Sequence, residues 1–237
     1  MFRSFRLGSV LGFPIDVNLS FLFLLGLVAL TMGGLTGVAV VLLAFASVVL
    51  HELGHAVVAR RLGGRVAGIE LHFFGGAAKI VDAPRTPGDE IAIAAAGPAV
   101  SFAIAGVSTM LAMLVPPAAP LFGALAWINL LLGAFNLIPA FPMDGGRILR
   151  ALLQRRMGHL RATEVAVLLA RGFAVALGLY GLVTLSFYLI LLAVLLWMMS
   201  GAEMQVARAH AHHERGGLYR VDLDPRRGVR WTRDRFV

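Results

Sequence analysis

Three long stretches that are almost free of charged residues constrain this chain more than any other feature of its sequence. No charged residue occurs from 17 to 50 or from 91 to 143, and Arg171 is the only one from 165 to 202. A membrane-spanning helix needs about 20 consecutive apolar residues, so each stretch is long enough for at least one span. With 59% hydrophobic and 14% charged residues, the chain is predicted to be an integral membrane protein.

Helix-breaking segments divide these stretches into spans. TMGGLTG at 31–37 lies within the first stretch, and VPPAAP at 115–120 lies within the second. Proline removes a backbone donor and glycine favours turns, so we expect two spans in each of these stretches. The third fits either one long tilted helix or two helices joined near GLVTLSF at 181–187.

The arginines favour one count of spans. Basic residues lie before the first span, after the second and the fourth, and from residue 208 onward, whereas the segments at 31–37 and 115–120 contain none. Because basic residues mark cytoplasmic loops, both chain termini are expected in the cytoplasm, and this requires an even number of spans. A cleaved signal peptide is the competing interpretation of the N-terminus, but its apolar region continues directly into another span and no small-x-small cleavage site follows.

The sequence thus predicts an all-α polytopic membrane protein with about six transmembrane helices. Residues 1–203 are expected to form the transmembrane domain and 204–237 a basic cytoplasmic tail. The segment from 67 to 80 has β-branched and aromatic residues together with Gly75 and Gly76, which predicts a short membrane-associated β segment. Its edge can pair with an extended substrate or can be a purely structural hairpin, and the sequence leaves both open.

Charge and cysteine content exclude other classes of function. The formal net charge is +8, but the basic residues lie between and after the apolar segments, where we interpret them as topology determinants and not as a nucleic-acid surface. The chain has no cysteine, so any metal must be held by nitrogen and oxygen atoms.

The segment HELGH at 51–55 places ionisable groups near the end of the second span. His51 and His55 are four residues apart, so on a helix they share one face and can bind one Zn²⁺. Glu52 is adjacent and can polarise or deprotonate a water molecule at the metal, as in H-E-x-x-H metalloproteases. Ionisable groups inside a membrane are costly and usually functional, which favours a metal site.

A catalytic zinc site needs a third protein ligand. Asp144 follows the helix-breaking Pro139 and Pro142 at the end of the fourth apolar segment, and we expect it to be that ligand. The segment by itself is equally compatible with Asp144 being the N-cap of the helix that follows. The presence of the two histidines favours Asp144 as a metal ligand. His72 is the reserve candidate, whereas the histidines at 210–213 are expected to lie in a solvated tail.

Asn129 and Asn136 are seven residues apart and share a helix face. Both can hydrogen-bond neighbouring helices, which is the usual role of asparagine in a bilayer. Asn136 is also close enough in sequence to Asp144 to point into the same site, where its amide can stabilise an oxyanion.

Three segments, HELGH, AGPAVS at 96–101 and FNLIPAFPMDGGRILRALL at 135–153, resemble the site-2 protease family of intramembrane zinc metalloproteases, peptidase family M50. The resemblance extends from about residue 6 to 204. It implies that His51, His55 and Asp144 bind one zinc ion per chain, that Glu52 is the general base and that Asn136 is the asparagine of the family's second motif.

The resemblance also implies the kind of substrate, namely transmembrane proteins that are cut within or at the edge of the bilayer. The segment at 115–120 is too short for the PDZ domain of some relatives, and the residues after 202 are too few for the CBS domains of others, so we expect a short form without either. The alternative is a membrane scaffold or transporter that binds zinc without hydrolysis. A transporter should distribute polar residues along a path. This chain concentrates them at one depth, beside a glutamate, which favours the protease.

Overall fold

The computed structural model describes residues 4–32, 34–72, 75–81, 86–216, 219–224 and 228–233. The chain forms two compact units. The first comprises Met1–Pro139 and Met143–Leu152, and the second comprises Ala140–Pro142 and Leu153–Val237.

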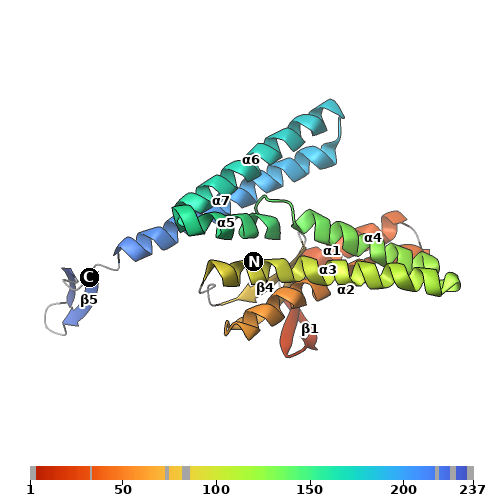
Figure 1. Cartoon of the computed structure of the whole chain (residues 1–237), viewed down its shortest axis with the longest axis horizontal. Helices are drawn as coiled ribbons and strands as arrows, with labels where there is room; N and C mark the ends of the chain where they lie inside the picture. Colours follow the sequence, from red (N-terminus) through yellow and green to blue (C-terminus); the bar gives the residue numbers. More distant parts are fainter. Residues whose placement is uncertain are drawn as a thin grey trace. The chain divides into compact units, whose positions relative to one another are not determined.

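The first unit contains four helices and the beginning of a fifth (Figure 1). Helices α2 and α3 pack closely, because a methyl group added at Gly54 would lie only 2.8 Å from the carbonyl oxygen of Ala96. Glycine therefore allows the two backbones to approach at the level of the HELGH segment. The helices are α1 (Leu19–Met32), α2 (Gly34–Arg61), α3 (Pro87–Leu114), α4 (Ala119–Asn136) and α5 (Asp144–Met157).

Local sequence explains where α3 begins and ends. The Thr86 side chain accepts a hydrogen bond from the Asp89 N–H, the Asp89 side chain accepts one from the Thr86 N–H, and Pro87 opens the helix. At the other end, the prolines of VPPAAP stop α3 and form the short 3-10 helix η1 (Pro116–Ala118) before α4. The predicted break of the second uncharged stretch is confirmed.

A four-stranded sheet in order β1-β2-β3-β4 completes the first unit. Strands β2 and β3 are parallel, and the other two pairs are antiparallel. Alternate residues of β2, Phe13, Ile15 and Val17, are buried in a core that includes Val49 and Leu53 of α2. The strands are β1 (Ser4–Val10), β2 (Phe13–Asn18), β3 (Val66–His72) and β4 (Gly75–Ile80).

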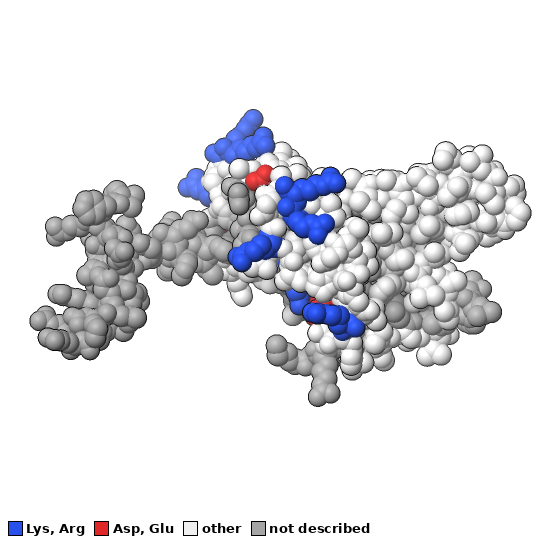
Figure 2. All heavy atoms as spheres, turned by 90° about the horizontal axis from the view of Figure 1, so that it is seen from below, with Lys and Arg blue, Asp and Glu red and all other residues white. Residues whose placement is uncertain are grey.

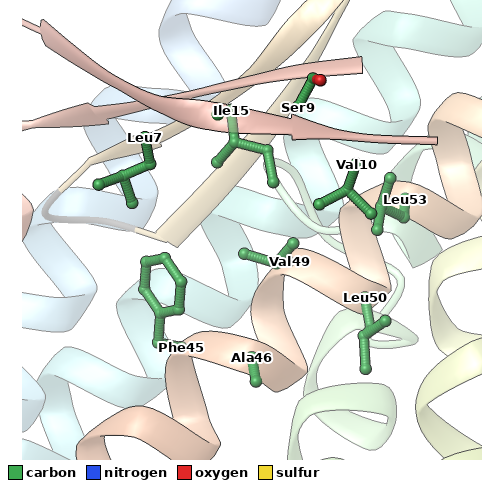
Figure 3. A pocket seen from close by; sticks show the side chains of 10 residues that line it. Leu7, Ser9, Val10, Ile15, Phe45, Ala46, Val49, Leu50 and Leu53 are labelled. Carbon is green, nitrogen blue, oxygen red and sulfur yellow. The ribbon is translucent and has the colours of Figure 1, made fainter. Parts of the chain in front are cut away.

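The β segment expected at 67–80 is confirmed as β3 and β4, whereas β1 and β2 were not expected. An apolar cavity of about 470 Å³ lies between these two strands and α2 (Figure 3). Phe45, Val49 and Leu53 line it from α2, and neither histidine of the HELGH segment lines it.

The second unit contains two long helices, α6 (His159–Val183) and α7 (Phe187–Gly216), that lie side by side (Figure 1). The turn between them includes Leu185 in a left-handed conformation, with φ 52°. The third uncharged stretch therefore forms two helices. A two-stranded antiparallel sheet follows, formed by β5 (Tyr219–Asp224) and β6 (Gly228–Arg233).

Five helical segments among the described residues are long and apolar enough to cross a membrane. On the face shown in Figure 2, much of the surface of the described residues carries no charged side chain. Helix α1 is a further uncharged helix of 14 residues. At about 1.5 Å per residue it extends about 21 Å, less than the roughly 30 Å hydrocarbon core. The chain is a multi-pass membrane protein. The five segments are Gly37–Arg61, Pro87–Leu114, Pro116–Asn136, His159–Val183 and Phe187–Arg208.

Candidate metal centre

The fold brings together the three side chains that the sequence singled out as metal ligands. His51 and His55 face α3 from the last part of α2 and are each 3% exposed. Asp144 opens α5 and is 7% exposed. Its Oδ2 lies 3.2 Å from Nε2 of His51 and 3.2 Å from Nε2 of His55. The two imidazoles and the carboxylate therefore converge on one buried point.

The other ring nitrogen of each histidine is held by α3. Nδ1 of His55 lies 2.7 Å from the carbonyl oxygen of Ile93, and Nδ1 of His51 lies 2.9 Å from Oγ of Ser101. A carbonyl oxygen only accepts, so Nδ1 of His55 must donate. In the neutral imidazole, Nε2 then carries the lone pair, which is the form that binds a metal.

Three observations test whether these residues fit a zinc ion. A lone pair on His55 Nε2 and a carboxylate oxygen, 3.2 Å apart, repel each other unless a proton or a cation lies between them. Tetrahedral zinc with bonds of about 2.0 Å separates its ligand atoms by about 3.3 Å. Two histidines and a carboxylate are also a donor set of catalytic zinc sites. The residues fit the ion.

Helix α3 leaves room for the site only because residue 97 is glycine. A methyl group added at Gly97 would lie 2.2 Å from Nε2 of His55 and 2.6 Å from Nε2 of His51. Any larger side chain at this position would occupy the space between the two nitrogens.

Glu52 is half-buried beside the two histidines and is held by strand β4. Its Oε2 accepts a hydrogen bond of 2.9 Å from the backbone N–H of Ala78. Potential ligand atoms of Glu52 and the two histidines all lie within 4.8 Å of one another. A carboxylate that can accept a proton therefore lies next to the point where the imidazoles converge.

The two asparagines of α4 have different partners. Asn136 donates from Nδ2 to the carbonyl oxygen of Leu132 on its own helix, at 2.9 Å. Asn129 is fully buried and donates to Oγ of Ser47 at 2.8 Å, one turn of α2 before His51. The backbone of His72 belongs to β3, but its side chain lies outside the described residues, as do the side chains of the histidines at 210–213.

Several contributors to the site were not assigned a role from the sequence. Gly97 and Ser101 lie within AGPAVS, and their four-residue spacing, which places them on one helix face, was the available signal. The carbonyl group of Ile93 carries no signal in the sequence, because every residue has one.

The chain is similar to known zinc metalloproteases. The model of peptidase family M50 matches residues 38–121 and 116–179. A zinc metalloprotease of Methanocaldococcus jannaschii is 38% identical over 208 residues, which cover 85% of this chain and 60% of that protein. Stage IV sporulation protein FB of Bacillus subtilis is 30% identical over 149 residues, 62% of this chain and 52% of that protein.

A solved structure is similar as well. The site-2 protease from Methanocaldococcus jannaschii superposes with a TM-score of 0.68 at 35% identity, covering 85% of this chain and 95% of that chain. By contrast, the chain spans about three-fifths of the length of the M. jannaschii zinc metalloprotease to which it is 38% identical.

Proposed function

The chain belongs to peptidase family M50, a family of zinc-dependent proteases, and from this premise we propose that it hydrolyses peptide bonds within transmembrane segments of other membrane proteins. The observation that carries the proposal is the convergence of His51, His55 and Asp144 at one buried point, with Glu52 beside it. A buried set of ionisable groups on a membrane-spanning helix is costly and is maintained for function.

In this proposal His51, His55 and Asp144 hold one zinc ion. Zinc, when bound, supplies a Lewis acid that polarises the peptide carbonyl and makes water more acidic. Glu52 accepts the proton of the attacking water and transfers it to the leaving amine. Oε2 already accepts a hydrogen bond from the Ala78 N–H, which makes Oε1 the more basic oxygen and the proposed proton acceptor.

Asn136 is the proposed donor to the oxyanion that develops on the peptide carbonyl. It ends α4, eight residues before Asp144. Its NH2 group has two N–H donors, and because the Leu132 carbonyl accepts from one of them, the other would donate to the oxyanion. Such a donor is worth roughly 100-fold or more in rate.

Strand β4 is the proposed docking edge for substrate. It lies at the edge of the sheet, and the Ala78 N–H points away from β3 to Glu52. An extended substrate segment that pairs with this edge would run beside the base. A transmembrane substrate must unwind locally for this, because helical hydrogen bonds shield its peptide groups.

We further propose that both termini lie in the cytoplasm, with 1–203 as the membrane-embedded protease domain and 204–237 as a basic cytoplasmic tail. Arg60 follows His51 by nine residues, a helical rise of about 13 Å, so the site would lie below the cytoplasmic surface of the membrane. Substrates should accordingly be cut in the cytoplasmic half of their transmembrane segment.

The test is incubation of the purified protein with a membrane-spanning model substrate, with and without a chelator, followed by mass spectrometry of the products. We expect chelator-sensitive cleavage in the cytoplasmic half, enhanced by glycine, proline or asparagine near the cut and suppressed by leucine. Zinc bound without cleavage under any condition would favour a zinc-binding scaffold. Cuts confined to the other half would contradict the orientation.

A further inference from the structure

Asp144, the third proposed zinc ligand, lies on α5, and contacts outside the zinc site must hold this helix in the required orientation. Asp144 lies in the first turn of α5, directly after the segment broken by Pro139 and Pro142. The first turn of α5 packs directly against the backbone of Leu137, since a methyl group added at Gly145 would lie 2.3 Å from the Leu137 carbonyl oxygen. One such contact fixes a point on the helix, but leaves its direction and its rotation about its axis undetermined.

A second contact of α5 is a buried ion pair with α3. Arg150 donates from Nε to Oε1 of Glu90 at 2.9 Å, and its Nη2 contacts the same oxygen. The Glu90 side chain is 7% exposed and the Arg150 side chain 13%. Neither charge is solvated to any large extent, so the two groups depend on each other.

The ion pair also connects the surroundings of two proposed ligands. Glu90 lies three residues before Ile93, whose carbonyl group receives the hydrogen bond from His55. Arg150 lies six residues after Asp144, a helical rise of about 9 Å. His55 of α2 thus contacts α3, α3 contacts α5 through the ion pair, and Asp144 of α5 contacts His55 again.

We propose that Glu90 and Arg150 are positioning residues, whose ion pair sets the direction and rotation of α5 so that the Asp144 carboxylate meets the two imidazoles. This inference rests on the proposed role of Asp144 as a zinc ligand. A buried ion pair adds little net stability compared with a neutral pair of similar shape, so a role in geometry accounts better for its presence.

The energetics of the pair allow a test that separates positioning from stability. Loss of Arg150 alone leaves an uncompensated buried carboxylate and destabilises the protein, whereas the double variant Glu90→Gln, Arg150→Met removes both charges and should fold. The full-length protein would be purified with each change, and zinc affinity measured by competition with a chelator. Substitution by Co²⁺ would report the ligand set through its visible spectrum.

We expect the double variant to keep the thermal stability of the parent but to bind zinc about 10- to 100-fold more weakly, with a changed Co²⁺ spectrum. Arg150→Lys alone should retain part of the affinity lost in the double variant, because lysine keeps the positive charge but lacks the second nitrogen with which the guanidinium contacts Glu90. The control Arg155→Met removes an exposed arginine from the same helix and should leave affinity and spectrum unchanged.

Two results would overturn the inference in distinguishable ways. If Asp144→Ala weakens zinc binding while the double variant retains full affinity and the parent spectrum, the ion pair does not position the ligand, and the ligand assignment stands. If Asp144→Ala itself retains full zinc affinity, the ligand assignment fails and the inference fails with it.

Discussion

His51 and His55 need only the four-residue spacing of one helix to share a face, but their ring orientation comes from another helix. Ile93 and Ser101 of α3 hold the two Nδ1 atoms, and this leaves both Nε2 atoms directed at Asp144. At the scale of the residue, the proposed chemistry therefore depends on which nitrogen of each imidazole is already hydrogen-bonded.

The first prediction at this scale concerns the proposed base. Glu52→Gln should retain about one zinc ion per chain, because the ligand set is unchanged, and should lose peptide cleavage by about 100-fold or more, because an amide cannot accept the proton. Elemental analysis and the cleavage assay measure the two effects. Glu70→Gln is the control, because it removes a carboxylate of β3 that is paired with Lys79 of β4, and it should remain active. An active Glu52→Gln variant would rule out the assigned base.

The second prediction concerns the space between the histidines. Gly97→Ala should abolish zinc binding, since its methyl group would lie 2.2 Å from Nε2 of His55. Gly106→Ala is a matched control in the same helix, because a methyl group there meets nothing within 4 Å. Comparable expression of the two variants, with zinc present only in the control, is the expected result. Full zinc occupancy in Gly97→Ala would mean that the ion binds elsewhere.

At the scale of the element, strand β4 packs against helix α2 around Glu52. The outward N–H of Ala78 bonds the carboxylate, and Gly76 allows the strand to lie so close that a methyl group there would be 2.5 Å from Cγ of Glu52. The strand therefore orients the proposed base as well as bordering the proposed substrate path.

This arrangement predicts the effect of proline on β4. Ala78→Pro removes the N–H that bonds Glu52 but no hydrogen bond to β3, so it should keep zinc and lower the cleavage rate at saturating substrate by about 10-fold or more. Ala77→Pro, by contrast, should remove a bond of the ladder and destabilise the hairpin. Thermal unfolding and cleavage kinetics distinguish the two variants. Unchanged kinetics in Ala78→Pro would show that the strand does not assist the base.

At the scale of the whole molecule, the distribution of arginine sets the proposed orientation. The turns at η1 and between α6 and α7 contain no basic residue. In the sequence, basic residues lie near the opposite ends of these helices, at Arg85 for α3, Arg147 for α4, Arg156 for α6 and Arg208 for α7. The membrane potential and the anionic cytoplasmic surface both favour this arrangement.

The absence of natural cysteine makes this orientation directly testable. Pro117→Cys and Leu185→Cys should react with a membrane-impermeant thiol reagent in intact cells. Arg156→Cys, at the end of α5, should react only after permeabilisation. The reverse pattern would place the proposed site on the other side of the membrane.

Local sequence determined the parts of this protein that depend on neighbouring residues. Uncharged runs interrupted by proline and glycine predicted the spans, since the bilayer imposes a minimum apolar length on every helix that crosses it. The break at VPPAAP and the two-helix form of the third stretch followed from such signals and from the parity of the arginine clusters. The HELGH segment indicated His51, Glu52 and His55, and the break at Pro139 and Pro142 together with the family resemblance indicated Asp144.

Tertiary structure alone decided what depends on contacts between distant residues. The sequence predicted neither β1 nor β2. Val17 of β2 opens an uncharged run that continues into α1, and composition does not separate a buried strand from the start of a helix. The Nδ1 partners of the histidines, the space above Gly97 and the ion pair of Glu90 with Arg150 join residues 38 to 60 positions apart. No local pattern encodes such pairs, because they form only when packing brings α2, α3 and α5 together.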